Sequence, residues 1–163
     1  MVEPLSTTRG VLFRGSGSAT PSRSISNAEL GQRVETSDEW IRSRTGIAAR
    51  RVVNSEESLA ELSGLAAERA LQMAGWSADS IDLILLATST PDDLFGSAPR
   101  LQARLGATNA AAFDLTAACS GFLFAVVTAA QYLRSGAMRR ILVVGADQLS
   151  RWVNWDDRRS CVL

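Results

Sequence analysis

The sequence has 163 residues, of which 46% are hydrophobic and 21% are charged, and this is enough for one globular domain with a sizeable core. Seventeen basic residues balance seventeen acidic ones, so no net charge draws the chain to nucleic acid or to an anionic membrane. The complete absence of histidine excludes a Ser-His-Asp triad, a Cys-His pair and a His-ligated metal site within the chain.

The sequence carries no signal for secretion or for a membrane span. Residues 1–10 lack the apolar core of a secretory signal, and no run of about eighteen apolar residues occurs. Two cysteines in such a chain indicate free thiols in a reducing compartment, so the sequence predicts a cytoplasmic protein. Without histidine, two cysteines are also too few for a structural zinc site.

The first third of the chain predicts short elements. Residues 11–19 predict a strand that runs into a Gly/Ser turn, and a short helix is expected to begin at Ser26 or Asn27. A second helix is expected over residues 36–45, because polar and acidic residues at its start favour an N-terminal cap. Residues 50–53 are expected to be extended.

The middle of the chain has stronger periodic patterns. Ser58 and Glu61 fit a capping box, and apolar residues then recur every three or four positions as far as Gly75, which predicts a helix. Residues 81–88 form an apolar run of strand length, typical of a strand covered on both faces in a parallel sheet. Residues 99–105 favour another helix.

Five more segments follow in the order strand, buried helix, strand, polar surface loop and start of a strand: residues 110–115, 120–133, 141–145, 151–159 and 160–163. Strands and helices alternate, so the sequence predicts an α/β fold with a mostly parallel sheet layered with helices. We expect one domain over residues 1–163. Because a domain rarely stops within an apolar strand, the chain is also expected to be truncated.

Cys119 lies where a predicted strand passes into the predicted buried helix. Small residues precede the thiol and Gly121 follows closely, so little steric cover is expected. The aligned peptide dipoles of the helix place partial positive charge at its N-terminal end, which favours thiolate over thiol. The local pattern therefore predicts a nucleophile, although an inert core cysteine fits that pattern equally well.

Three motifs stand out along the chain: TSDEWI at residues 36–41, RTGI at 44–47 and the thiol within AACSGF at 117–122. Weaker segments accompany them in order, at residues 15–21, 142–147 and 157–163. Together they resemble β-ketoacyl-acyl-carrier-protein synthase III, a thiolase-fold condensing enzyme, over nearly the whole chain. The resemblance implies an enzyme about twice this length, of which this chain is the N-terminal half and the C-terminal domain is missing.

The resemblance also implies a reaction. Cys119 would take an acyl group from acyl-CoA, typically acetyl-CoA, as a thioester and pass it to the carbanion formed when malonyl-acyl-carrier-protein loses CO2. This step initiates type II fatty acid synthesis. The backbone N–H of Cys119 would contribute to the oxyanion hole, and the family's catalytic His and Asn have no counterpart here. No metal or redox cofactor is implied, because acyl-CoA is a substrate.

The resemblance further assigns residues to substrate binding. Trp40 would stack on the adenine of CoA, Arg158 would cover its other face, and Arg44 would reach the phosphates. Thr36 and Thr45 would line the same region. The family is usually a homodimer, in which Phe95 would cross the interface into the partner's acyl pocket.

Simpler interpretations stay open for several of these residues. Trp40 on an amphipathic helix is typical of packing, and Arg44 and Arg158 are typical of solvated surface charges. Cys161 is expected to be a small buried hydrophobe on a strand. A disulfide between Cys119 and Cys161 is disfavoured in a reducing compartment.

Two further patterns allow more than one interpretation. Gly15 and Gly17 resemble part of a dinucleotide-binding fingerprint, but Thr20 stands where the third glycine is required, so a tight turn is favoured. Trp152 and Trp155 either cover a substrate channel or simply pack in a loop.

Two rival functions accompany the condensing-enzyme hypothesis. One is another thiolase-fold acyl-CoA enzyme, such as a polyketide chain initiator or a hydroxymethylglutaryl-CoA synthase-like enzyme. The other is a non-catalytic fragment, which a stop codon directly after Leu163 would favour.

Overall fold

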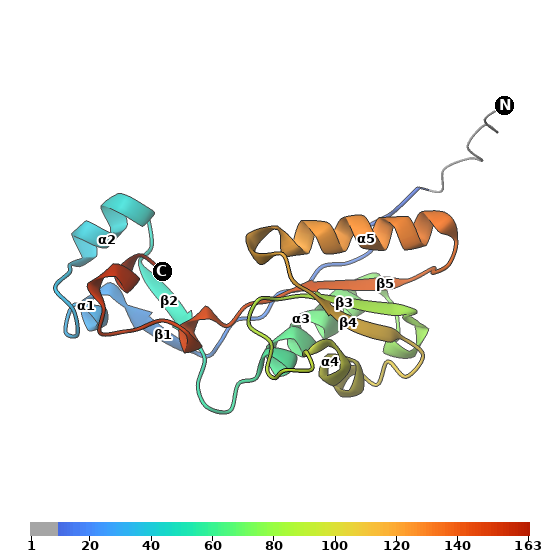
Figure 1. The fold of residues 1–163 in the computed structure, drawn as a ribbon, viewed down its shortest axis with the longest axis horizontal. Helices are drawn as coiled ribbons and strands as arrows, with labels where there is room; N and C mark the ends of the chain where they lie inside the picture. The colour runs from blue at the N-terminus through green and yellow to red at the C-terminus, as the bar shows by residue number, and fades with distance from the viewer. Residues whose placement is uncertain (1–9) are drawn as a thin grey trace. The chain divides into compact units, whose positions relative to one another are not determined.

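The computed structural model of the protein describes residues 10–163 (Figure 1). These residues form two compact units. We call residues 10–19 and 59–147 the sheet unit, and residues 20–58 and 148–163 the hairpin unit. The single domain over residues 1–163 stays a prediction. So does the absence of a secretory signal, because residues 1–9 lie outside the described part of the chain.

The sheet unit contains α3 (Leu59–Ala74), the short 3-10 helix η1 (Ala78–Ser80), β3 (Leu83–Ala87), α4 (Ala98–Leu105), β4 (Ala111–Leu115), the 3-10 helix η2 (Ala118–Ser120), α5 (Gly121–Ser135) and β5 (Ile141–Gly145). The three strands are parallel, in the order β4-β3-β5. Each of the strands and α-helices lies where the sequence predicts it. The predicted α/β class with a parallel sheet is thereby confirmed.

The central strand β3 is buried on both faces. Leu83, Leu85 and Ala87 pack with α5, whereas Ile84 and Leu86 pack with α3 and α4. Figure 1 shows α5 on one side of the sheet and α3 with α4 on the other. Because successive side chains of a strand point to opposite faces, a strand covered on both sides needs the uninterrupted apolar run seen here. Burying each leucine or isoleucine stabilises the fold by about 1.5–3 kcal/mol.

The helix α5 buries only a face of small residues. Gly121, Ala125 and Ala129 are buried, and the two alanines pack on the sheet. Large apolar side chains on the other face are 47–68% exposed: Phe122, Leu123, Phe124 and Val127. The predicted helix is confirmed, but its prediction as a buried helix is wrong for this face within residues 10–163. An apolar helical segment indicates a buried helix, but the sequence does not show which part of the structure covers each of its faces.

The hairpin unit contains β1 (Arg23–Ser26), α1 (Asn27–Leu30), α2 (Asp38–Thr45), β2 (Ala49–Val52), and the 3-10 helices η3 (Leu149–Arg151) and η4 (Arg158–Val162). The strands β1 and β2 pair antiparallel. Ser26 caps α1 and Ser37 caps α2, each through its side chain, and Gly46 ends α2 in a left-handed conformation. The buried core of this unit consists of Ile25, Leu30, Val34, Ile41, Val52 and Cys161.

Two strands predicted from the sequence are wrong. Residues 11–19 pair with no strand among the described residues and instead lie against α3, where a Cβ added to Gly17 would collide with the carbonyl oxygen of Ala66. Residues 160–163 belong to η4 and its end, because the side chain of Asp157 accepts a hydrogen bond from the N–H of Arg159 at 2.9 Å and starts a helical turn. Within residues 10–163, no helix combines the length and hydropathy that crossing a membrane requires.

Candidate active site

Cys119 lies at the corner between β4 and α5. β4 ends at Leu115, η2 carries the thiol, and α5 begins at Gly121. The thiol is exposed and forms no disulfide. Ala118, directly before it, has φ of 46°, a left-handed conformation that is strained for a residue with a side chain. Backbone strain of this kind concentrates at functional sites. The backbone conformation of this corner and its residue types therefore both indicate a functional site.

Contacts between strand ends fix this corner. A Cβ added to the buried Gly121 would lie 3.3 Å from the Cβ of Ala87, so α5 starts close against the end of β3. Asp147, just after β5, accepts a hydrogen bond from the N–H of Ser89 at 2.8 Å, and the hydroxyl of Thr88 donates to the same oxygen at 3.4 Å. The carboxyl ends of parallel strands form the edge at which α/β sheets bind ligands, and the thiol follows one of these ends.

An exposed thiol at the N-terminal end of a helix suits nucleophilic chemistry. The partial positive charge at the helix N-terminus stabilises negative charge in the first turn. A cysteine sulfur in such a place can hold an acyl group as a thioester. The chain has no histidine, so no imidazole within residues 1–163 accepts a proton from this thiol. Among the described residues, no group of three or more His, Cys, Asp or Glu is arranged to hold a metal ion.

Trp40 on α2 has two guanidinium groups close to its ring. The guanidinium carbon of Arg44 lies 4.1 Å from the ring centroid, and that of Arg158 lies 4.6 Å from it. Arg158 also donates from Nε to the carbonyl oxygen of Glu35 at 2.6 Å. The structure therefore brings together three of the residues predicted to bind CoA, from two distant segments of the chain. Indole rings and guanidinium planes are surfaces on which nucleobases stack.

Thr36 and Thr45 make local hydrogen bonds in the hairpin unit. The hydroxyl of Thr36 donates to the sulfur of Cys161 at 3.7 Å. The hydroxyl of Thr45 donates to the carbonyl oxygen of Ile41 at 2.8 Å and accepts from the N–H of Ile47 at 3.0 Å. Cys161 is 1% exposed, which confirms its prediction as a buried residue. The contact of both threonines with CoA stays a prediction.

Phe95 lies in the sheet unit, in the loop between β3 and α4. Its side chain is 88% exposed, and that of its neighbour Leu94 is 93% exposed. Two adjacent apolar side chains in solvent are available for contact with another molecule. The place of Phe95 in a partner's acyl pocket stays a prediction.

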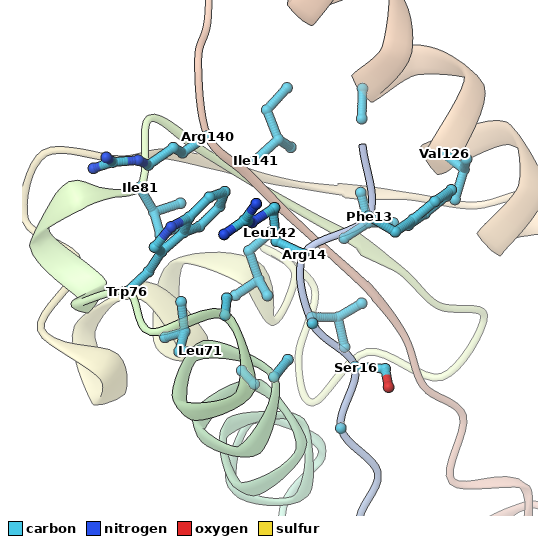
Figure 2. Close-up of a pocket in the computed structure, with 18 of the residues that line it drawn as sticks. Phe13, Arg14, Ser16, Leu71, Trp76, Ile81, Val126, Arg140, Ile141 and Leu142 are labelled. Carbon is cyan, nitrogen blue, oxygen red and sulfur yellow. The ribbon is translucent and has the colours of Figure 1, made fainter. Parts of the chain in front are cut away.

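A cavity of about 330 Å³ lies beside β5 (Figure 2). Residues 11–17, α3, α5 and β5 line it, and none of the predicted site residues does. Figure 2 shows apolar side chains such as Trp76 and Leu142 around it, together with Arg14 and Arg140. Within residues 10–163, β5 pairs with β3 on one side only, so the cavity borders the open edge of the sheet and does not identify an acyl-binding site.

Asp38 connects α2 to α1. The side-chain amide of Asn27 donates to Oδ1 of Asp38 at 2.8 Å, and Nε of Arg42 donates to both carboxylate oxygens at 2.8 Å. The hydrogen bonds from Arg42 and then from Asn27 hold the pKa of Asp38 below its ordinary value. The first turn of the helix that carries Trp40 is therefore fixed by an ionised carboxylate.

Asp114 on β4 is a residue whose part in the site the sequence did not predict. Its carboxylate accepts hydrogen bonds from the backbone N–H groups of Ser97 and Ala98 at the start of α4. The sequence did contain one signal for this role. Asp114 is the lone acidic residue of an apolar strand, and a carboxylate in such a place needs hydrogen-bond partners.

Comparison with known proteins gives a consistent match. A family model described as 3-Oxoacyl-[acyl-carrier-protein (ACP)] synthase III matches residues 113–163, which include Cys119. The chain is 71% identical over 163 residues to the β-ketoacyl-[acyl-carrier-protein] synthase III of Prochlorococcus marinus (strain MIT 9313), and the match covers 100% of this chain and 48% of the relative. The chain thus spans about half the length of the curated relatives it matches.

Two solved structures resemble the protein in fold and sequence. The 3-oxoacyl-[acyl-carrier-protein] synthase III from Aquifex aeolicus VF5 has a TM-score of 0.88 and 44% identity, over 92% of this chain and 49% of that chain. The priming β-ketosynthase of the R1128 polyketide pathway has a TM-score of 0.85 and 36% identity, over 90% and 44%. The predicted thiolase-like fold is confirmed. In sequence and in fold, the chain is similar to about half of the β-ketoacyl-[acyl-carrier-protein] synthase III proteins that it matches.

Proposed function

We propose that the complete product of the reading frame that encodes this chain is an acyltransferase that initiates type II fatty acid synthesis. The observation that carries the proposal is the exposed thiol of Cys119 at the head of α5. The 71% identity to a relative named β-ketoacyl-[acyl-carrier-protein] synthase III supports it. Its substrates are acyl-CoA, typically acetyl-CoA, and malonyl-acyl-carrier-protein.

The reaction has two half-reactions. The sulfur of Cys119 attacks the carbonyl carbon of acyl-CoA, a thioester forms on the enzyme, and the thiolate of CoA leaves. Malonyl-acyl-carrier-protein then loses CO2, and the resulting carbanion attacks the enzyme thioester. The Cys119 sulfur leaves, and with an acetyl primer the product is acetoacetyl-acyl-carrier-protein. The N–H of Cys119 contributes to the oxyanion hole in both steps.

The hairpin unit supplies the binding site for the nucleotide end of CoA. Trp40 and Arg158 take the adenine, with Arg158 moving from its contact with the indole ring to the far face of the base. Arg44 reaches the phosphates, where its planar fork suits phosphate oxygens. Thr36 and Thr45 line the same region through the hydroxyls that now make local hydrogen bonds.

The acyl end of the substrate lies near the sheet unit. In a homodimer, Phe95 from one subunit contributes to the acyl pocket of the other, and its 88% exposure supports this placement. The reaction needs no metal or redox cofactor and involves neither nucleic acid nor a membrane. We place the enzyme in the cytoplasm, where both thiols stay free.

Mass spectrometry of the complete gene product after incubation with acetyl-CoA tests the function. We expect one acetyl group on Cys119, no adduct in the Cys119→Ser variant, and an unchanged adduct in the Cys161→Ser variant. Addition of malonyl-acyl-carrier-protein should then remove the adduct and form acetoacetyl-acyl-carrier-protein. An adduct confined to another residue would refute the proposal.

A second candidate is the priming of polyketide synthesis, favoured by the 36% identity to the R1128 priming β-ketosynthase. The two candidates share the thioester on Cys119 and differ in the carrier protein they accept and the primer they prefer. Parallel assays with the carrier proteins of the two pathways separate them. A hydroxymethylglutaryl-CoA synthase-like enzyme would instead consume acetoacetyl-CoA, so this substrate belongs in the same assay.

A further inference from the structure

The loop formed by residues 92–98 is held by hydrogen bonds and an ion pair, although its two large apolar side chains are exposed. The N–H of Phe95 donates to Oδ1 of Asp93 at 2.8 Å, and Arg100 makes an ion pair with the other oxygen of Asp93 at 2.6 Å. The N–H of Asp92 donates to the hydroxyl of Ser97 at 2.8 Å. The loop therefore presents Leu94 and Phe95, which are 93% and 88% exposed, from a hydrogen-bonded backbone.

The carboxylate of Asp114 joins this loop to β4. The N–H of Ser97 donates to Oδ2 at 2.9 Å and to Oδ1 at 3.1 Å, and the N–H of Ala98 donates to Oδ1 at 2.6 Å. Ser97 and Ala98 are fully buried, and the side chain of Ser97 makes no cap to α4. Asp114 thus satisfies backbone donors at the start of α4 that are shielded from water.

Gly96 shows how closely the loop lies on this carboxylate. A Cβ added to Gly96 would lie 2.9 Å from Cγ of Asp114, and φ of Gly96 is 91°, in the left-handed region. Glycine is therefore required here for both space and conformation. The residue next to Phe95 is fitted against the strand whose end leads to Cys119.

We propose that Asp114 is a positioning residue that fixes Phe95 on its own subunit, and so determines which acyl groups the partner's thiol accepts in the proposed homodimer. The inference rests on the proposed function, in which Phe95 contacts the acyl group. Asp114 precedes Cys119 by five residues on the same strand and its following turn. Loss of the carboxylate frees the start of α4, and Phe95 then loses the fixed position from which it reaches the acyl pocket of the partner subunit.

The test compares variants of the complete gene product. Asp114→Leu removes the acceptors, whereas Asp114→Asn keeps one oxygen at nearly the same place. Asp82→Leu is the matched control, because Asp82 is also half-buried and its Oδ2 accepts from the N–H groups of Arg139 and Arg140 at 2.7 and 2.9 Å, before β3 begins. Two quantities are measured: hydrogen exchange at residues 97 and 98, and the ratio of the initial rates at which acetyl-CoA and hexanoyl-CoA acylate Cys119.

We expect Asp114→Leu to speed exchange at Ser97 and Ala98 at least about tenfold and to change the acylation ratio about fivefold or more. Asp114→Asn should stay close to the wild type in both, and Asp82→Leu should leave both unchanged. If Asp114→Leu does not fold, Gly96→Ala takes its place, because the added Cβ displaces the loop while the carboxylate stays. It should change the ratio in the same way.

Three results would overturn the inference. They are unchanged exchange at residues 97 and 98, faster exchange with an unaltered acylation ratio, and an equal change of ratio in Asp82→Leu, which would indicate a general loss of stability. A wild-type protein that no acyl-CoA acylates would instead refute the proposed function, and the selectivity role of Asp114 with it.

Discussion

The two cysteines of the chain differ in their surroundings. Cys119 is exposed at the start of α5, whereas Cys161 is 1% exposed and accepts a hydrogen bond from the hydroxyl of Thr36. Reaction at a buried thiol requires local opening of the structure, which costs a few kcal/mol. The difference in burial alone therefore predicts that the thiol of Cys119 can react and that the thiol of Cys161 serves in packing.

We predict that iodoacetamide modifies Cys119 of the folded protein about a hundredfold faster than Cys161, because about 2.8 kcal/mol of local opening corresponds to this factor. Peptide mapping by mass spectrometry after timed alkylation measures both rates. In denaturant the two rates should become similar. Equal rates in the folded protein would contradict the burial of Cys161.

Trp40 and Trp76 offer a matched pair of tryptophans. Each has an arginine over its ring, with Arg44 at 4.1 Å and Arg158 at 4.6 Å from Trp40, and Arg140 at 5.1 Å from Trp76. Both rings also pack against a core cluster. A change in packing should affect both, whereas a change in base stacking should affect only Trp40.

We predict that Trp40→Leu raises the KM for acetyl-CoA about five- to 150-fold with little change in kcat, because stacking a base on an aromatic ring contributes about 1–3 kcal/mol. Trp76→Leu should lower stability but leave KM unchanged. Steady-state kinetics of the complete gene product checks this. A KM that changes equally in both variants would leave only the packing role for Trp40.

At the scale of elements, the start of α2 depends on an ionised side chain. Hydrogen bonds from Arg42 and Asn27 hold the pKa of Asp38 below its ordinary value of about 3.9. A lowered pKa in the folded state means that the carboxylate adds stability above the unfolded-state pKa. This contribution is lost as the pH falls through the folded-state pKa.

We predict that Asp38→Asn removes this acid-dependent part of stability. The free energy of unfolding of the wild type, from urea titrations between neutral pH and pH 3, should decrease more steeply than that of the variant. Glu39→Gln, in the same turn of α2, is the control and should keep the wild-type slope. Identical curves for the wild type and Asp38→Asn would show that the carboxylate titrates as an ordinary exposed group.

Most elements of the fold were predictable from sequence because their signals are local. The apolar run of β3 and the cap of α2 each lie within a few residues. The false strands over residues 11–19 and 160–163 had suitable side chains, but a strand also needs a pairing partner, which a local pattern does not show.

The candidate site likewise has features that the local sequence predicts and features that it does not. The corner at Cys119 follows from local sequence, and the approach of Arg158 to Trp40 was expected only through the resemblance to a family. The hydrogen bonds of Asp114 and the exposed face of α5 depend on contacts between distant segments, which no local periodicity encodes.

At the scale of the whole molecule, many large apolar side chains of the sheet unit face solvent. On α5 and on the loop of residues 92–98, they are Phe122, Leu123, Phe124, Val127, Leu94 and Phe95. Exposed apolar side chains in such number are typical of an interface and favour association in water.

We predict that the 163-residue chain expressed alone self-associates, binds a hydrophobic dye such as ANS, and has no condensing activity. The apolar faces account for the first two results, and the absence of any histidine, a residue that the resemblance implies for the condensation step, accounts for the third. Analytical ultracentrifugation, dye fluorescence and a condensation assay check them. A monodisperse monomer with one sharp thermal transition would contradict the expected association.

The hairpin unit is assembled from stretches that lie far apart in the chain. Arg50 on β2 donates to the carbonyl oxygens of Cys161 and Leu163 at 3.2 and 3.1 Å, over sequence separations of 111 and 113. During translation, Arg158 therefore cannot reach Trp40 until every strand of the sheet unit has left the ribosome. Chains fold from their N-terminal parts as they emerge, and closing so long a loop costs entropy. The nucleophile's corner is thus free to form first, and the surface proposed to hold its acyl donor is completed last.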